Sequence, residues 1–140
     1  MGILFKNADI TLYNKYYDRV NDIDRYQRFV IKGVNWQGKR NATITDKGLL
    51  MADSVLIFLD VNDVEGKVYI GPKMFNRLSE EERPGYFTLG TKDKVVKGEV
   101  NFEITGLKPN SIADLENNYD DVVSILGITP WNNHLEVECK

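Results

Sequence analysis

The sequence lacks the features that mark several large classes of protein. It has one cysteine, Cys139, which cannot form an internal disulfide, so nothing points to an oxidising compartment. Its 18 basic residues are scattered and its net charge is −3, whereas a dedicated phosphate-backbone binder needs clustered Lys and Arg. No apolar run approaches the ~18 residues of a membrane span, and the start of the chain is too polar for a signal peptide. We expect one soluble intracellular domain over residues 1–140, with no membrane partner.

Catalytic and metal-binding motifs are also scarce. His134 is the only histidine, and on a strand it would lie on the face opposite Cys139, with no third ligand near. The stretch "GTKDK" (90–94) lacks the second glycine and the Gly-Lys-Ser/Thr ending of a phosphate loop. We therefore expect no catalytic residues, no metal and no cofactor.

The densest acidic stretch is "ADLENNYDDVVSI" (113–125), which raises the question of a calcium loop. A loop that starts at Asp114 would need glycine at its sixth position and glutamate at its twelfth, but Tyr119 and Ile125 stand there. The pattern instead predicts a short capped helix, with Ser111 as N-cap. Asp120 and Asp121 then fall in a solvated turn before a buried strand.

Period-two alternation of apolar and polar residues dominates the chain and predicts strands. In residues 10–17, Ile10 and Leu12 share one face with Tyr16, and Tyr13 and Tyr17 lie on the other. Further strands are predicted at 24–36, 54–61, 95–104, 121–128 and 134–139, and Gly33 is expected to mark a bulge or bend in the second. Short helical turns are predicted after Pro72 and Ser79. The fold class is mainly β: a small β-barrel or sandwich of six to seven strands with two or three short helical turns.

One connection stands out, because residues 38–53 are predicted to form a long loop between the second strand and the most apolar one. It contains a possible short strand at 42–45, a turn at 46–48 and then three consecutive apolar residues. Long loops in compact domains are usually functional or mobile. The apolar residues would either pack under the barrel or be offered to a partner.

Several stretches, in this order, resemble a known family: "NADITLYNKYYD", "VIKGVNWQ", "ADSVLIFLDV", "YFTLGTKDKVVKGEV" and "DLENNYDDVVSI". The family consists of small proteins encoded in the head–tail joining region of tailed phages and prophages of Gram-positive bacteria. The resemblance covers about Asn7 to Val137. The chain departs from it at "TPWNNHLEVE", where relatives have a longer glycine-containing turn, which puts in doubt any contact carried by that turn.

The resemblance implies a virion protein of the phage neck, made in the bacterial cytoplasm. Neck proteins of this kind are β-barrels that form rings of six or twelve copies between a portal or adaptor protein and the tail subunits. In head-closure (stopper) proteins, a long loop from each subunit converges on the channel and retains packaged double-stranded DNA, which passes without sequence readout. The candidate channel loop has these residues: Lys39, Arg40, Asp46, Lys47, Gly48, Leu49, Leu50, Met51. Candidate subunit contacts are Asp120, Asp121, Tyr13 and Tyr17.

Two alternatives stay open at this point. A tail-terminator or tail-completion subunit would occupy a neighbouring place in the virion, but such proteins more often have substantial helices beside the sheet. An OB-like single-stranded nucleic-acid binder could stack bases on Tyr13, Tyr17 and Trp36, if these rings are exposed.

Overall fold

The computed structural model describes residues 5–45, 48–64, 66–132 and 134–140, with the backbone alone described for 39–45, 48–53 and 63. The described residues form two α-helices, two 3-10 turns and eight strands. In order they are β1 (Ala8–Asp18), β2 (Ile23–Thr45), β3 (Gly48–Leu59), η1 (Val61–Asp63), β4 (Val68–Tyr69), α1 (Pro72–Arg77), η2 (Arg83–Gly85), β5 (Tyr86–Phe87), β6 (Lys94–Lys97), α2 (Ile112–Asn118), β7 (Val122–Pro130) and β8 (Leu135–Cys139).

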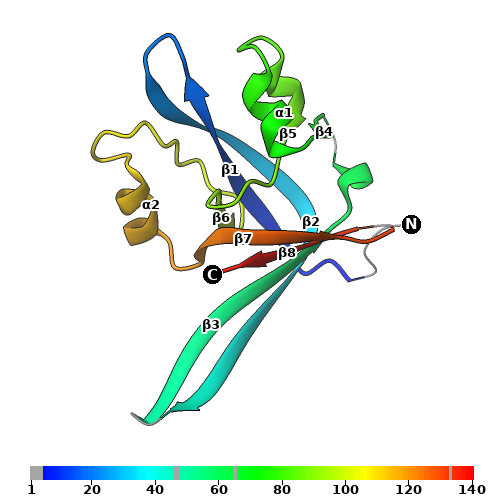
Figure 1. The fold of residues 1–140 in the computed structure, drawn as a ribbon, viewed down its shortest axis with the longest axis vertical. Helices are drawn as coiled ribbons and strands as arrows, with labels where there is room; N and C mark the ends of the chain where they lie inside the picture. Colours follow the sequence, from blue (N-terminus) through cyan, green and yellow to red (C-terminus); the bar gives the residue numbers. More distant parts are fainter. Residues whose placement is uncertain (1–4, 46–47, 65, 133) are drawn as a thin grey trace.

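Six strands close into a barrel in the order β1-β2-β3-β8-β7-β6, with each neighbouring pair antiparallel. The short strands β4 and β5 form a separate parallel pair. In Figure 1, α1 and α2 lie on opposite sides of the β1–β2 hairpin, outside the barrel. The prediction of a mainly β fold with few short helices is therefore confirmed.

The barrel encloses the main hydrophobic core. Strand β8 shows why its sequence folds this way, because Leu135, Val137 and Cys139 alternate with polar residues and are all buried, as predicted. Ile10 and Leu12 of β1 enter the same core. Burying a large aliphatic side chain stabilises a fold by roughly 1.5–3 kcal/mol, so this alternation fixes the register of the barrel.

A second, smaller cluster lies outside the barrel, beneath α2. Tyr13, Val96, Ile104 and Leu115 form it, and all four are buried. The capping box predicted at the start of α2 is confirmed, since Ser111 and Asp114 exchange side-chain and main-chain hydrogen bonds. This cap fixes where α2 begins and so places Leu115 against the outer face of β1 and β6.

The strand predicted over residues 95–104 is wrong beyond Lys97. Gly98 has a φ of 97°, a left-handed conformation that ends β6. Residues 99–105 belong to no helix or strand, and Val100 and Phe102 pack on the second cluster. Their alternation reflects packing on this cluster and not a place in the barrel.

Strand β2 is the longest element, with 23 residues, and it crosses the whole molecule (Figure 1). It pairs with β1 from Ile23 to Val34 and with β3 from Asn35 to Thr45. Between these halves the register with β1 shifts, because Ala8 faces Val34 whereas Ile10 faces Ile31. Gly33 has a φ of 77° at this point, so the predicted bulge is confirmed.

Candidate functional site

The segment predicted as a long loop is a two-stranded arm. Its strands pair in continuous antiparallel register from Asn35 opposite Phe58 to Thr45 opposite Gly48. Strand β3 pairs with β8 only from Val55 onward, so residues 39–45 and 48–54 pair only with each other among the described residues. In Figure 1 this arm projects from the barrel on the side away from the β1–β2 hairpin. The loop prediction is wrong because a ribbon outside the barrel needs no alternating apolar face, which is the signal by which the other strands were found.

The root of the arm is held firmly on the barrel. The Asn7 side chain accepts a hydrogen bond from the Trp36 main-chain N–H at 2.8 Å and donates one to the Trp36 carbonyl at 3.1 Å. The Trp36 side chain is 8% exposed and belongs to the barrel core. The arm therefore leaves the barrel in a direction that buried contacts determine.

The candidate channel residues divide between the two strands of this arm. Lys39 and Arg40 belong to β2, and Gly48, Leu49, Leu50 and Met51 belong to β3. Asp46 and Lys47 lie outside the described residues. The structure thus places the described members of the set in one projecting element.

The candidate subunit contacts differ in their exposure to solvent. Asp120 and Asp121 are exposed in the bend between α2 and β7, as predicted. Tyr17 is 45% exposed and remains available for a contact. Tyr13 cannot make one, because it is completely buried in the second cluster and its hydroxyl donates to the Phe102 carbonyl at 2.6 Å. Around Tyr13, the face of β1 that was expected to meet solvent is covered by α2 and the segment before it, whereas Tyr17 on the same face stays exposed.

A buried polar network, which the sequence did not reveal, joins β1 to the turn before β6. The Asn14 side-chain amide donates to the Thr88 carbonyl at 2.6 Å and to Asp93 Oδ2 at 2.9 Å, and its oxygen accepts from the Thr88 N–H at 3.1 Å. Asp93, 4% exposed, also accepts from the main-chain N–H groups of Gly90 and Lys15. Burial raises the pKa of the Asp93 carboxyl despite these donors. The signal in the sequence is that Asn14 lies on the strand face that Ile10, Leu12 and Tyr16 otherwise make apolar.

The raised pKa of Asp93 predicts an unusual pH dependence of stability. Because the native state binds this proton more tightly than the unfolded chain, Asp93 contributes stability near and below pH 3.8, and that contribution is lost as pH rises through the native pKa. We expect the unfolding free energy of the wild type, minus that of Asp93→Asn, to increase as pH falls from 7 toward 4. Urea unfolding at several pH values measures it.

Comparing the wild type with Asp93→Asn removes the effect of the other carboxyl groups on the pH dependence. Hydrogen bonds from Asn21 lower the pKa of Asp18, and hydrogen bonds from Ser111 lower the pKa of Asp114. The contribution of these two carboxylates to the unfolding free energy is therefore lost at acid pH, and it is lost equally in the wild type and in Asp93→Asn. A difference that stays constant or falls as pH falls would contradict the account.

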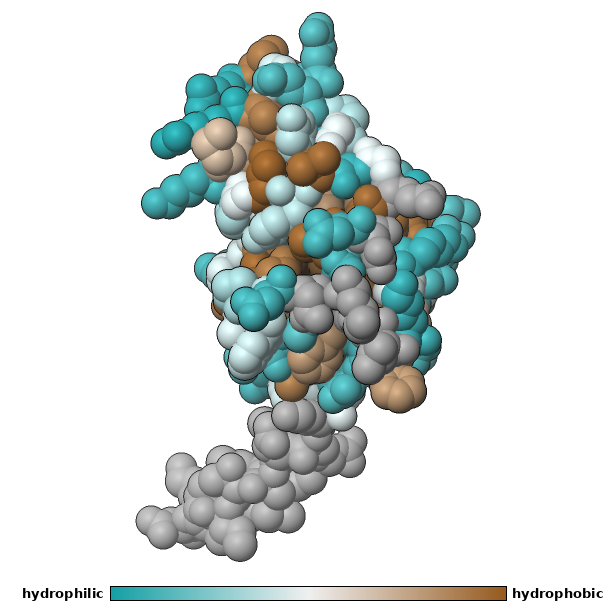
Figure 2. All heavy atoms as spheres, turned by 90° about the vertical axis from the view of Figure 1, so that its right-hand side faces the viewer, coloured by the Kyte–Doolittle hydropathy of each residue, from teal (hydrophilic) through white to brown (hydrophobic). Residues whose placement is uncertain are grey.

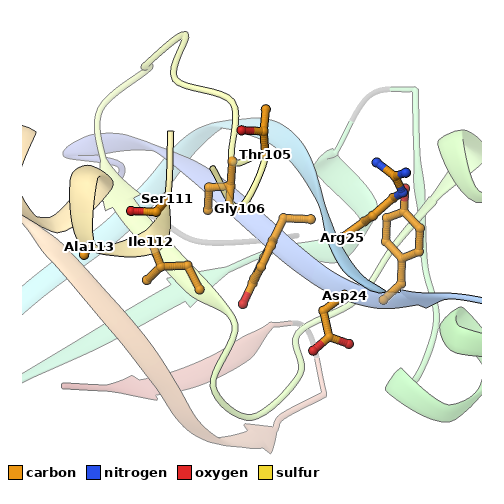
Figure 3. A pocket seen from close by; sticks show the side chains of 10 residues that line it. Asp24, Arg25, Thr105, Gly106, Ser111, Ile112 and Ala113 are labelled. Carbon is orange, nitrogen blue, oxygen red and sulfur yellow. The ribbon is translucent and has the colours of Figure 1, made fainter. Parts of the chain in front are cut away.

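A hollow of about 440 Å³ lies beside the β1–β2 hairpin. Figure 3 shows it between Asp24 and Arg25 on one side and residues of the segment from Thr105 to Ala113 on the other. Tyr16 and Tyr26 also line it. Its lining mixes apolar and polar residues: Tyr16, Tyr26, Ile104 and Ile112 with Asp24, Arg25, Thr105 and Ser111.

The described residues contain no group of three or more His, Cys, Asp or Glu side chains that could hold a metal ion. None of the helices described is long and apolar enough to cross a membrane. The face shown in Figure 2 mixes hydrophobic atoms in its upper half and centre with hydrophilic side chains at its margins. Val68 on β4 and Met74 on α1 are among the exposed apolar residues.

These observations define a class of protein: a small closed antiparallel β-barrel with a long two-stranded arm. The chain belongs to the family described as "Family of unknown function (DUF6751)", whose family model matches residues 5–140. No curated protein and no solved structure matches the chain.

Proposed function

We propose that this chain is a non-enzymatic structural subunit of a phage head–tail connector, of the head-closure (stopper) type. It assembles with itself into a ring of six or twelve copies in the neck of the virion. The ring binds the portal or an adaptor on one side and tail subunits on the other. Packaged double-stranded DNA passes through its channel and is retained there without sequence readout.

The observation that carries this proposal is the arm. The resemblance implies a long loop at the channel, and residues 38–53 are our candidate for it. The described parts of this segment form a ribbon that leaves a closed barrel. Residues 39–45 and 48–54 of the arm pair with each other, whereas β3 pairs with β8 from Val55 to Leu59. The arm can therefore reach a channel axis while the barrel stays closed. Its root is fixed through Asn7 and Trp36, so each copy in a ring would present its arm in the same direction.

The charge of the chain is consistent with this role. A ring through which a genome slides should not bind phosphates tightly, and a net charge of −3 without clustered basic residues suits such passage.

The alternatives receive less support. A tail-terminator subunit would be expected to have larger helices, whereas α1 and α2 have six and seven residues. The nucleic-acid-binding alternative needed three exposed rings, but Tyr13 is buried and Trp36 is 8% exposed, which leaves Tyr17 alone.

Electron microscopy of particles made without this protein tests the proposal. Deleting the gene should give filled or leaking heads without tails, and a plasmid copy should restore complete particles. Normal tailed particles from the deletion strain would overturn the proposal.

A second expectation concerns the exposed bend between α2 and β7. Replacing Asp120 and Asp121 with lysine should weaken assembly of the ring, because these carboxylates are proposed to meet basic residues of a neighbouring copy. Stability should change by no more than about 0.5 kcal/mol, as for most surface substitutions. Thermal unfolding and in vitro complementation of deletion heads measure the two effects. The matched control is Glu81→Lys, which reverses an exposed charge elsewhere; unchanged complementation by the Asp120/Asp121 variant would reject the contact.

A further inference from the structure

Strand β2 has an open edge in its first half. From Ile23 to Val34 it pairs with β1 on one side, and its other side has no strand partner among the described residues until β3 begins to pair at Asn35. An exposed strand edge carries unpaired main-chain donors and acceptors, which are a template for pairing with another chain.

The hydrogen-bonding pattern of β1 shows which residues face this edge. The Asp9 carbonyl accepts from the Gly98 N–H, and the Lys15 N–H donates to Asp93, so the odd-numbered residues of β1 turn their main chain away from β2. In an antiparallel pair, successive residues of a strand turn their main-chain groups to opposite sides. The even-numbered residues of β1 therefore bond to the odd-numbered residues of β2, for example Leu12 to Phe29 and Tyr16 to Arg25.

The even-numbered residues of β2 therefore direct their main-chain groups to the open side. These are Asp24, Tyr26, Arg28 and Val30. Within the described part of the chain, no hydrogen bond to their main-chain N–H or C=O groups is found on that side. The edge thus offers up to eight groups over seven residues.

The neighbouring segment does not cover this edge near the tip of the hairpin. The hollow of about 440 Å³ separates residues 24–26 from residues 104–106 and 111–113 (Figure 3). Both Tyr16 and Tyr26 line it, although they lie on opposite faces of the hairpin, so the hollow runs along the strand edge and not over one face. Asp24 and Arg25 are exposed beside it.

The sequence of this edge is complementary to itself. If two antiparallel copies meet with Tyr26 opposite Tyr26, then Asp24 of each copy faces Arg28 of the other, and Ile23 faces Phe29. The pairing therefore combines opposite-charge pairs with apolar pairs, and these are the pairs that stabilise sheets. Centring the pairing on Asp24, Arg25 or Arg28 would instead place like charges opposite each other.

We propose that two copies of this chain associate edge to edge through β2, antiparallel about a two-fold axis at Tyr26. Arg28 already donates to Glu103 and to the Val100 carbonyl, but a guanidinium has five N–H donors and can bind a second carboxylate. A two-fold interface of this kind is closed, because both copies use the same surface. It does not depend on the proposed ring, and it would be present in the isolated protein.

A charge-swap experiment tests the pairing. Sedimentation of the purified wild type over a range of concentrations should show reversible dimers. Asp24→Lys and Arg28→Glu should each weaken self-association by about tenfold or more, because each converts two attractive cross-strand pairs into two repulsive ones. An equimolar mixture of the two variants should dimerise again. In the mixed dimer the introduced lysine of one chain faces the introduced glutamate of the other, and the remaining Arg28 faces the remaining Asp24.

The control for this experiment is Glu81→Lys, which reverses an exposed charge outside both proposed contacts and should dimerise like the wild type. Circular dichroism checks that each variant is folded. A monomeric wild type at all concentrations, or a mixture no more associated than its components, would overturn the proposal. Because ring assembly is tested with Asp120 and Asp121, failure of the dimer and failure of the connector proposal are distinguishable.

Disulfide trapping tests the register. Directly opposite residues in a hydrogen-bonded antiparallel pair have Cα atoms about 5.5 Å apart, within the range that a disulfide bridges. Tyr26→Cys should form a dimer under mild oxidation, and Gln27→Cys should not, because Gln27 faces Arg25 of the other copy. The native Cys139 is buried and should not compete. Trapping at position 27 but not at position 26 would contradict the proposed axis.

Discussion

Shortening the arm is expected to abolish DNA-filled tailed particles while leaving the barrel folded. The variant replaces residues 41–52 with Asn-Gly, a two-residue turn suited to a hairpin, between Arg40 and Asp53, which face each other in the arm. The barrel should tolerate this change, because the removed residues pair only with one another among the described residues. Retention of DNA should fall to the level of the gene deletion, because nothing would reach the channel axis.

Two measurements are needed for this variant. Thermal unfolding of the purified protein should show a cooperative transition near that of the wild type, and electron microscopy of complemented particles should show heads that leak DNA to the same extent as those of the deletion strain. A graded control replaces only residues 43–50 with Asn-Gly, between Ala42 and Met51, and should retain part of the activity. Full particle yield from the shorter arm, with a folded barrel, would contradict a channel role.

The largest effect on stability is expected at Asn14. The change Asn14→Ala removes three hydrogen bonds in a buried site and leaves the Thr88 N–H, the Thr88 carbonyl and one Asp93 oxygen short of partners. An unsatisfied buried group costs about 1–3 kcal/mol, so we expect a loss of about 3–5 kcal/mol in the free energy of unfolding. That is a large share of the total stability of a small domain.

Urea unfolding at neutral pH measures this loss. Asn76→Ala serves as the matched control, because Asn76 donates a single hydrogen bond, to the Pro72 carbonyl, at an exposed position. It should cost less than about 1 kcal/mol. An Asn14 variant as stable as the Asn76 variant would show that the network does not hold β1 to the turn before β6.

Where one face of an element is buried, the sequence predicted the structure well. The alternation of Leu135, Val137 and Cys139 correctly placed β8, and the capping pair Ser111 and Asp114 correctly placed the start of α2. Gly33 marked the bulge because few other residues adopt a positive φ. In each case a local requirement (a buried strand face, a helix cap or a positive φ) restricts which residue types can stand at a position.

The errors occurred where tertiary contacts determine the outcome. Tyr13 was expected on an exposed face, because alternation along β1 does not reveal that α2 covers its outer side. The sequence predicts a loop at residues 38–53, because a ribbon outside the core has no period-two apolar pattern. Asn14 and Asp93 are 79 residues apart, so their pairing could not be read from local spacing.

Antibody labelling of assembled virions by electron microscopy tests the central claim most directly. If the chain is a connector subunit, an antibody against it should label complete particles at the junction of head and tail, and the label should be absent from particles that the deletion strain makes. Purified infectious particles that do not contain the chain, or label confined to the capsid shell or the tail tip, would contradict the account.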